Sequence, residues 1–286
     1  MRVLVAGATG VLGRRIVPSL VARGHRVTAL TRTTKGGAAA YESGAEPALA
    51  DVLDAEALTR AVRAAAPDVV MHQLTALRDG DMEANARIRT AGTRNLVDAA
   101  ARAGVGRIVA QSIAWAYEPG DDPADETTAL DLSAPAPRRR SVGGVTALEA
   151  AVRELPEWVV LRYGMLYGPG TWYAPDGLMA DRARAGKLLA DADVTSFLHA
   201  DDAAEAALQA LTWPSGAVNV CDDEPAPGTA WVPGFCAAVG APPPSYADPA
   251  GARHGWARGA DNTRARELLG WTPGHPSWRE GFAEFG

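Results

Sequence analysis

Cysteine is scarce in this chain of 286 residues, because Cys221 and Cys236 are the only two. So few cysteines exclude the disulfide framework of small secreted proteins. No apolar run approaches the roughly 20 residues that a membrane-spanning helix needs. The 28 basic and 34 acidic residues give a net charge of −6, and the longest basic run is Arg138–Arg140, whereas nucleic-acid binding requires a basic face. We expect a cytoplasmic globular protein with neither a membrane nor a nucleic acid as its partner.

Lysine is almost absent as well. The chain has 26 arginines but only two lysines, Lys35 and Lys187, so chemistry that needs a lysine at one place has two candidates. The five histidines and two cysteines show no spacing typical of metal ligands. A GxSxG nucleophile turn and a GxxxxGK[ST] phosphate loop are also missing. The sequence therefore predicts no metal site and neither of those two chemistries.

What is present is a regular alternation of two patterns through the first 165 residues. Hydrophobic residues make up 47% of the chain, which is enough for a normal core. Short apolar runs predict strands at Arg2–Ala6, Arg26–Leu30, Glu46–Ala50, Asp68–His72, Arg107–Gln111 and Trp158–Arg162. Amphipathic stretches predict helices at Val11–Arg23, Ala55–Ala65, Ala84–Ala103 and Val142–Glu154. This alternation is typical of a doubly wound parallel α/β sheet.

A glycine-rich turn joins the first strand to the first helix. Gly7, Gly10 and Gly13 fall where a dinucleotide-binding turn needs them: the first permits the tight turn, the second lets a pyrophosphate approach, and the third lets the helix pack on the strand. Such a triplet alone is a weak signal, and the alternative is a purely structural turn. The strand before it and the helix after it favour the dinucleotide site.

The end of the second strand selects between the two nicotinamide cofactors. An acidic residue there holds a ribose 2′-hydroxyl, whereas a basic residue accepts a 2′-phosphate. This sequence has Arg32 at that place and no acidic residue before Glu42. We therefore expect a preference for NADP(H), with NAD(H) still open. The alternative is that Arg32 and Lys35 are solvated loop charges.

Several motifs in order along the chain resemble the extended short-chain dehydrogenase/reductase family, in its epimerase/dehydratase-like group. They are Gly7–Gly13, Ala50–Val52, Pro67–His72, Gly92–Ala100, Leu161–Gly170, Phe197–Ala203 and Leu268–Trp271. The resemblance implies a Rossmann-type domain over 1–165 and a smaller C-terminal substrate-binding domain over 166–286, with segments such as 195–220 able to pack back on the sheet. It also implies that cofactor contacts come from Thr9, Val11, Leu12, Asp51, Val52, Leu74, Thr75 and Ala76, beside the three glycines and Arg32.

The family's proton relay, a Tyr-x-x-x-Lys pair with a Ser or Thr, is not present. No tyrosine of the chain is followed by lysine four residues later, and the pair aligns with Ser141 and Val145. A replacement acid is therefore needed. We expect Tyr117 with Ser112, or else Tyr163, to take this role. The alternatives are that Tyr117 only covers the sheet edge and that the family's hydroxyl position falls on Ile113.

Two further segments are candidates for function. Tyr167, Trp172 and Tyr173 lie where the resemblance places a substrate pocket, and they either stack on a planar substrate or pack in a core. His199 and His72 are expected to be structural. Residues 118–141 form a long Pro-rich and acidic loop, which indicates a lid or a disordered linker.

Three functions follow from these patterns. The first is an NADP(H)-dependent oxidoreductase of a small-molecule carbonyl or alcohol with an atypical active site. The second is a redox-neutral epimerase or dehydratase that keeps its dinucleotide bound, and the third is a dinucleotide sensor without turnover. A homodimer is compatible with the sequence, which does not specify the substrate.

Overall fold

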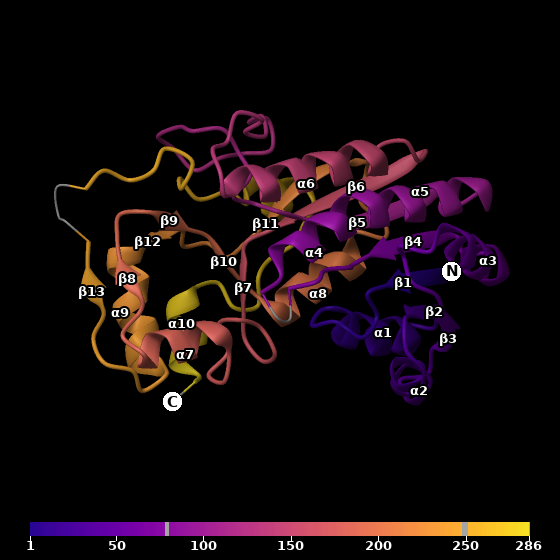
Figure 1. Cartoon of the computed structure of the whole chain (residues 1–286), viewed down its shortest axis with the longest axis horizontal. Coiled ribbons are helices and arrows are strands. Elements are labelled where there is room, and N and C mark those ends of the chain that lie inside the picture. Colours follow the sequence, from indigo (N-terminus) through magenta and orange to yellow (C-terminus); the bar gives the residue numbers. More distant parts are fainter. Residues whose placement is uncertain (78–79, 248–250, 286) are drawn as a thin grey trace. The chain divides into compact units, whose positions relative to one another are not determined.

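The computed structural model describes residues 1–77, 80–247 and 251–285 (Figure 1). The chain divides into two compact units, each made of separate stretches. Unit 1 comprises residues 1–112, 132–161 and 204–217, and unit 2 comprises residues 113–131, 162–203 and 218–286. The stretch 204–217, inside the range expected to pack on the sheet, belongs to unit 1. No helix in the described parts of the chain has the length and apolar character to cross a membrane.

A seven-stranded sheet has the order β11–β6–β5–β4–β1–β2–β3. Its strands are β1 Arg2–Ala6, β2 Arg26–Thr31, β3 Glu46–Leu49, β4 Val69–His72, β5 Arg107–Ile113, β6 Glu157–Tyr163 and β11 Gly216–Val220. Strand β1 pairs in parallel with both β2 and β4, and the strand order reverses there. Open α/β sheets bind ligands at such a reversal, beyond the carboxyl ends of the strands. The predicted Rossmann-type sheet is confirmed.

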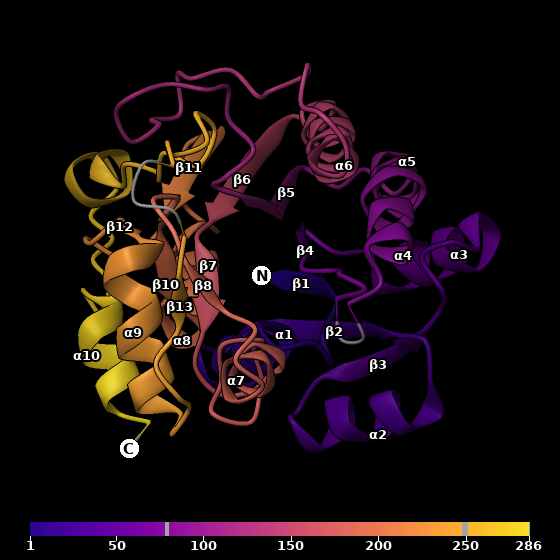
Figure 2. The same ribbon diagram turned by 60° about the vertical axis from the view of Figure 1, so that its left-hand side comes forward.

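Helices flank the strands of unit 1 on both faces. They are α1 Gly13–Ala22, α2 Thr34–Glu42, α3 Ala55–Ala65, α4 Met82–Arg87, the π-helical turn η1 Ile88–Gly92, α5 Thr93–Arg102 and α6 Arg138–Val152, and α8 Ala200–Gln209 continues from unit 2 into unit 1. Figure 2 shows α1 on one side of the strands and α3, α5 and α6 on the other. The core between sheet and helices is aliphatic, with Leu4, Leu58, Leu96 and Ile108 fully buried.

Helix α3 matches its predicted range because its signals are local. The Asp54 side chain accepts a hydrogen bond from the Ala57 amide and caps the first turn. Leu58 and Val62 lie four residues apart on one helix face and are fully buried. Helix α2 was not predicted, because Gly36 and Gly37 lower its helix propensity and no apolar stripe marks it.

Unit 2 contains short strands and three helices of its own. They are β7 Met165–Tyr167, β8 Leu189–Ala190, β9 Val194–Thr195, β10 Phe197–His199, β12 Ala226–Pro227, β13 Ser245–Tyr246, α7 Leu178–Arg184, α9 Gly228–Ala238, the π-helical turn η2 Arg264–Leu268 and α10 Trp278–Ala283. Helices α9 and α10 pack side by side. The core of this unit is aromatic, with Phe197, Phe235, Trp278 and Phe282 buried together.

The long segment from residue 118 is ordered, so the alternative of a disordered linker is wrong. Isolated bridges join Tyr117 to Leu130 and Ala124 to Ala260. The side chain of Asn219 donates to the Ala124 carbonyl, and its backbone amide donates to Glu126. These contacts replace the missing periodic secondary structure up to the start of α6 at Arg138, four residues before the predicted start.

Candidate functional site

The turn between β1 and α1 is closed by its own backbone. The Gly10 amide donates to the Gly7 carbonyl at 3.0 Å, and Gly7 has a φ of +96°. A Cβ at Gly7 would lie 2.4 Å from the Gln73 carbonyl oxygen, and one at Gly13 would lie 2.2 Å from the Gly7 carbonyl oxygen. Only glycine fits at these two places. Gly10 is exposed, and a Cβ there would meet only the Gly7 oxygen, at 3.2 Å.

Gln73 presents an unsatisfied polar group beside this turn. Its backbone lies against Gly7, its side chain is 4% exposed, and neither Nε2 nor Oε1 has a hydrogen-bond partner among the described residues. Buried polar groups without partners are rare, and a ligand is one way to satisfy them. The close-approach glycines and the orphaned amide fit a bound dinucleotide.

Side chains from other elements fix the two other segments that are expected to contact the cofactor. The Asn95 side chain donates to the Val52 carbonyl at 3.0 Å, and Asp51 accepts the Leu53 amide at 2.9 Å. The Leu74 carbonyl accepts from Gln111 at 3.3 Å, and the Ala76 amide donates to Asn85 at 3.0 Å. Thr75 between them is exposed. Both segments therefore follow strands of unit 1 with a fixed backbone.

Ser112 lies near the end of β5 with its hydroxyl already bonded. Its Oγ donates to Glu149 Oε1 of α6 at 2.8 Å, and both side chains are buried, at 4% and 1% exposure. Ser141 and Val145, where the family's pair aligns, are 8% and 0% exposed on the same helix. The hydroxyl of Ser112 is thus bonded to α6 at Glu149. This residue lies about one helical turn after Val145 and two turns after Ser141.

The two tyrosines expected to donate a proton are buried in unit 2. The Tyr117 phenol is 1% exposed, donates to Asn219 Oδ1, and accepts from Arg162 Nη1 at 3.0 Å. Arg162 also stacks on the Tyr117 ring, 4.9 Å from its centroid. The Tyr163 phenol is 3% exposed and donates to the Ala203 carbonyl. These contacts are of a structural kind, and the catalytic role of both tyrosines stays a prediction.

The aromatic residues of the expected substrate segment contribute to the core of unit 2. Tyr173 is 6% exposed, with its ring 5.3 Å from Phe197 and 5.4 Å from Phe235. Tyr167 is fully buried, and its hydroxyl has no hydrogen-bond partner among the described residues. Burial raises the pKa of both phenols well above their ordinary value. Trp172 is half-buried at the edge of the same cluster. Contact of these side chains with a substrate stays a prediction.

The sheet order and the glycine turn agree with a match to a known family. Residues 3–221 match the model of the NAD-dependent epimerase/dehydratase family. The chain belongs to this family. Three relatives sharpen the assignment. A 3-diazoavenalumate denitrifying reductase from a Streptomyces species is 49% identical over 98% of this chain and 99% of its own.

The other two relatives are more distant. A 2-alkyl-3-oxoalkanoate reductase from Stenotrophomonas maltophilia is 29% identical over 85% of this chain and 77% of its own. The UDP-glucose 4-epimerase of Thermus thermophilus, solved in complex with NAD, is 25% identical, covers 99% of this chain and 97% of its own, and has a TM-score of 0.76. The chain is thus an NAD(P)-dependent oxidoreductase or epimerase, with a nicotinamide dinucleotide as its cofactor.

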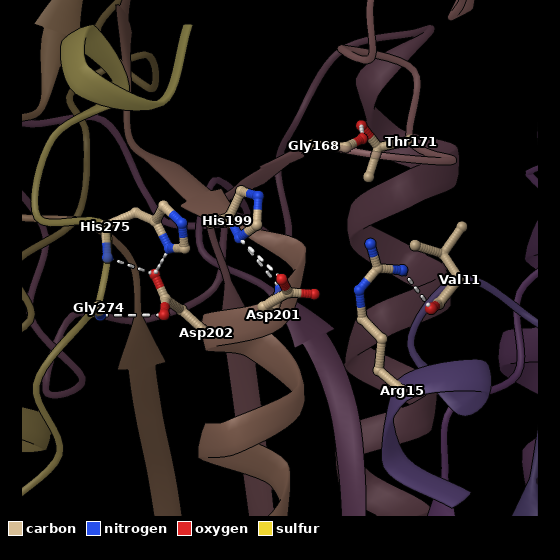
Figure 3. A network of polar contacts seen from close by, with 9 residues as sticks. All are labelled: Val11, Arg15, Gly168, Thr171, His199, Asp201, Asp202, Gly274 and His275. Carbon is tan, nitrogen blue, oxygen red and sulfur yellow. Dashed lines mark hydrogen bonds and ion pairs between the residues drawn. The ribbon is translucent and has the colours of Figure 1, made fainter. Parts of the chain in front are cut away.

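A network around Asp202 holds the segment before α10 in this family member. Figure 3 shows Asp202 accepting from the Gly274 and His275 amides and from His275 Nδ1. The His275 ring stacks on His199 with centroids 3.8 Å apart, and a Cβ at Gly168 would collide with His199. One ligand atom each of His199, Asp202 and His275 lie within 4.8 Å of one another. Because both Asp202 oxygens already accept hydrogen bonds, the group has a structural explanation without a metal ion.

His72 is also held in a structural network. It is fully buried at the end of β4, its Nδ1 accepts the Leu74 amide, and its Nε2 lies 2.8 Å from Thr93 Oγ1. Burial, with a smaller effect of the Arg89 charge, lowers the pKa of His72 to about 4. The imidazole is therefore neutral at pH 7, with its proton assigned to Nε2 by these contacts.

Two buried residues in unit 1 escaped the sequence-based reasoning. Gln73 follows a strand whose pattern gives no sign that its amide lacks partners. Arg89 is 6% exposed, and it lies between Asn85 and Gly92 on the buried face of the predicted helix over residues 84–103. Arginine is rarely buried without a partner, so an arginine on such a face indicates a site.

Proposed function

We propose that this protein is an NADP(H)-dependent reductase that removes the nitrogen of a diazonium group from a small organic molecule. The observation that supports this most strongly is the 49% identity, over essentially both full chains, with a reductase that denitrifies a diazo compound. The missing proton relay supports the same reaction on chemical grounds.

Proton balance separates this reaction from carbonyl reduction. A carbonyl takes up one hydride and one proton to become an alcohol, so it needs an acid near its oxygen. A diazonium ion, R–N₂⁺, takes up one hydride and gives R–H and N₂, without consuming a proton. The bound reduced nicotinamide supplies the hydride in either case. A site with serine and valine where the family has tyrosine and lysine is adequate for the second reaction.

The cofactor is held in this proposal by the residues of unit 1 described above. Gly7, Gly10 and Gly13, with the backbone of Thr9, Val11 and Leu12, receive the pyrophosphate at the start of α1. Asp51 and Val52 face the adenine end, and Leu74, Thr75 and Ala76 line the nicotinamide side. We add Gln73 to this set, because a bound dinucleotide would give its buried amide a partner.

Arg32 supports the preference for NADP(H). It follows β2 directly, is exposed, and precedes Thr33, whose side chain caps α2 by accepting the Gly36 amide. A guanidinium at the end of β2 suits a 2′-phosphate. The neighbours solved with NAD leave the choice between the two cofactors to a direct measurement.

The experiment uses 4-carboxybenzenediazonium as the substrate probe. We expect the protein with NADPH to release one N₂ and one benzoate for each NADPH oxidised, detected by mass spectrometry and by absorbance. The reaction without protein and with the Gly10→Val variant measures the uncatalysed background. A rate equal to that background would contradict the proposal.

Carbonyl reduction is a second candidate, supported by the oxoalkanoate reductase relative. For that reaction Tyr117 with Ser112, or else Tyr163, would have to supply the proton, and Tyr167, Trp172 and Tyr173 would face the substrate. Each proposed donor would have to leave its present hydrogen bond.

A cytoplasmic location and a homodimer are kept as predictions from the sequence.

A further inference from the structure

Arg89 is a buried cation without a partner in the described part of unit 1. It lies in η1 with 6% of its surface exposed. No hydrogen bond or ion pair joins its guanidinium to any residue that the structure describes. A buried charge is costly unless an opposite charge or hydrogen bonds compensate it.

The surroundings of Arg89 leave it charged. Burial lowers the pKa of its guanidinium to about 10, so it remains a cation at pH 7. The charge of Arg89 acts on His72, which is neutral and supplies no negative charge. A cation of this kind, partly stripped of water, binds an anion more strongly than an exposed arginine does.

Glycine on α6 makes room for the Arg89 side chain. A Cβ at Gly144 would lie 3.3 Å from Arg89 Cδ and 3.4 Å from its Cβ, so the arginine stem packs directly on the helix backbone. Ser141 and Gly144 are three residues apart and share one face of α6, and Val145 adjoins them. Arg89 therefore reaches the part of α6 where the aligned tyrosine and lysine are missing.

We propose that Arg89 binds a carboxylate of the substrate and so selects diazonium compounds that carry one. This inference rests on the proposed function and names its substrate class. The two nitrogens at the end of a guanidinium match the two oxygens of a carboxylate. The bound carboxylate would compensate the charge of this largely buried arginine, which has no protein partner among the described residues.

The binding test uses benzoate and its neutral analogue benzamide, each with the full chain saturated with NADP⁺. We expect benzoate to raise the melting temperature of the wild type and benzamide to leave it unchanged. In Arg89→Met the benzoate affinity falls roughly 10- to 100-fold, the usual effect of losing a hydrogen bond to a charged group. Arg87→Met, at an exposed arginine of α4, is the matched control and keeps the wild-type affinity.

Two results of this test would overturn the inference. One is benzoate binding that is absent from the wild type or equal in wild type and Arg89→Met. The other is an NADP⁺ affinity that falls tenfold or more in Arg89→Met, because Arg89 would then hold the cofactor. Arg89→Lys keeps the charge without the planar fork and should bind benzoate with intermediate affinity, which tests the site in a second variant.

Steady-state kinetics separate this inference from the function on which it rests. We expect Arg89→Met to raise KM for 4-carboxybenzenediazonium at least tenfold and to leave KM for benzenediazonium unchanged. Equal KM changes for both probes would contradict the carboxylate site and leave the reductase intact. Benzoate binding through Arg89, with neither diazonium reduced by the wild type, would instead contradict the proposed function alone.

Discussion

The glycine turn and helix α6 belong to the same unit but differ in how far they follow the family's pattern: the turn has its three glycines, whereas no Tyr-x-x-x-Lys pair stands on α6. At the turn, Gly7 and Gly13 are required by close backbone approach, down to 2.2 Å for a Cβ at Gly13. On α6, the aligned relay positions hold Ser141 and Val145, both buried. We therefore expect dinucleotide binding and proton transfer to be separable in this fold, because different elements would supply them.

The difference between the two regions indicates what constrains the sequence of each one. The turn is constrained by the cofactor, whose pyrophosphate any member must accommodate. The relay is constrained by the reaction, and the proposed loss of N₂ from the substrate would make it dispensable, because that reaction consumes no proton.

The largest effect is expected from Gly10→Val in the turn. A Cβ there meets only the Gly7 oxygen at 3.2 Å, so the fold should persist while the branched side chain blocks the pyrophosphate. Calorimetry should show dinucleotide affinity reduced more than about 100-fold. Gly106→Ala, where a Cβ meets nothing within 4 Å, is the control. Wild-type affinity in Gly10→Val would mean that the turn is only structural.

His72 tests how strongly burial in unit 1 holds an imidazole in its neutral form. Its pKa is lowered to about 4 in the folded protein, mainly by burial, so below pH 6.5 the unfolded state binds more protons. The free energy of unfolding should fall as the pH drops from 6.5 to about 4, by about 3 kcal/mol in all. Urea unfolding of His72→Gln should lack this component. An unchanged pH dependence would show that His72 is not held neutral.

Arg32→Ala tests the adenosine end of the turn region. Losing a charge-assisted contact to the 2′-phosphate should weaken NADP(H) by about 1.5–3 kcal/mol. Because Arg32 is exposed, NAD(H) affinity and stability should stay at the wild-type level. Equal affinity of the wild type for both cofactors would remove Arg32 from this role.

Tyr117→Phe gives the smallest effect and tests the relay side directly. The phenol bonds Asn219 and Arg162, while the ring contact with Arg162 survives in phenylalanine. Unfolding free energy should fall by about 1–2 kcal/mol, with diazonium turnover within a few-fold of the wild type. Tyr246→Phe, at an exposed tyrosine, controls for the substitution. A turnover loss of about 100-fold at unchanged stability would instead identify Tyr117 as a proton donor.

Local patterns made much of unit 1 predictable. Strand β1 and helix α3 have the predicted bounds. The signals of each element are local: a short apolar run for β1, and for α3 an apolar stripe that follows the Asp54 cap. Unit 2 was harder, since its two-residue strands and helix α9 have no clear periodicity, and Pro233 stands inside α9.

The contacts of the candidate site lie beyond such patterns. Tyr117 meets Asn219 across 102 residues, and Ser112 meets Glu149 across 37. Which hydroxyl is already bonded, and which buried group lacks a partner, depends on long-range packing. The sequence therefore predicted a cofactor site and a missing relay, but it left the bonding of each candidate donor open.

The most direct test of the central claim is the number of protons consumed for each NADPH oxidised. The measurement is made in weakly buffered solution with 4-carboxybenzenediazonium, recording proton uptake and NADPH absorbance together. The account predicts no proton uptake, because hydride replaces N₂ and the reaction as proposed consumes no proton. Uptake of one proton per NADPH, as in carbonyl reduction, would contradict it.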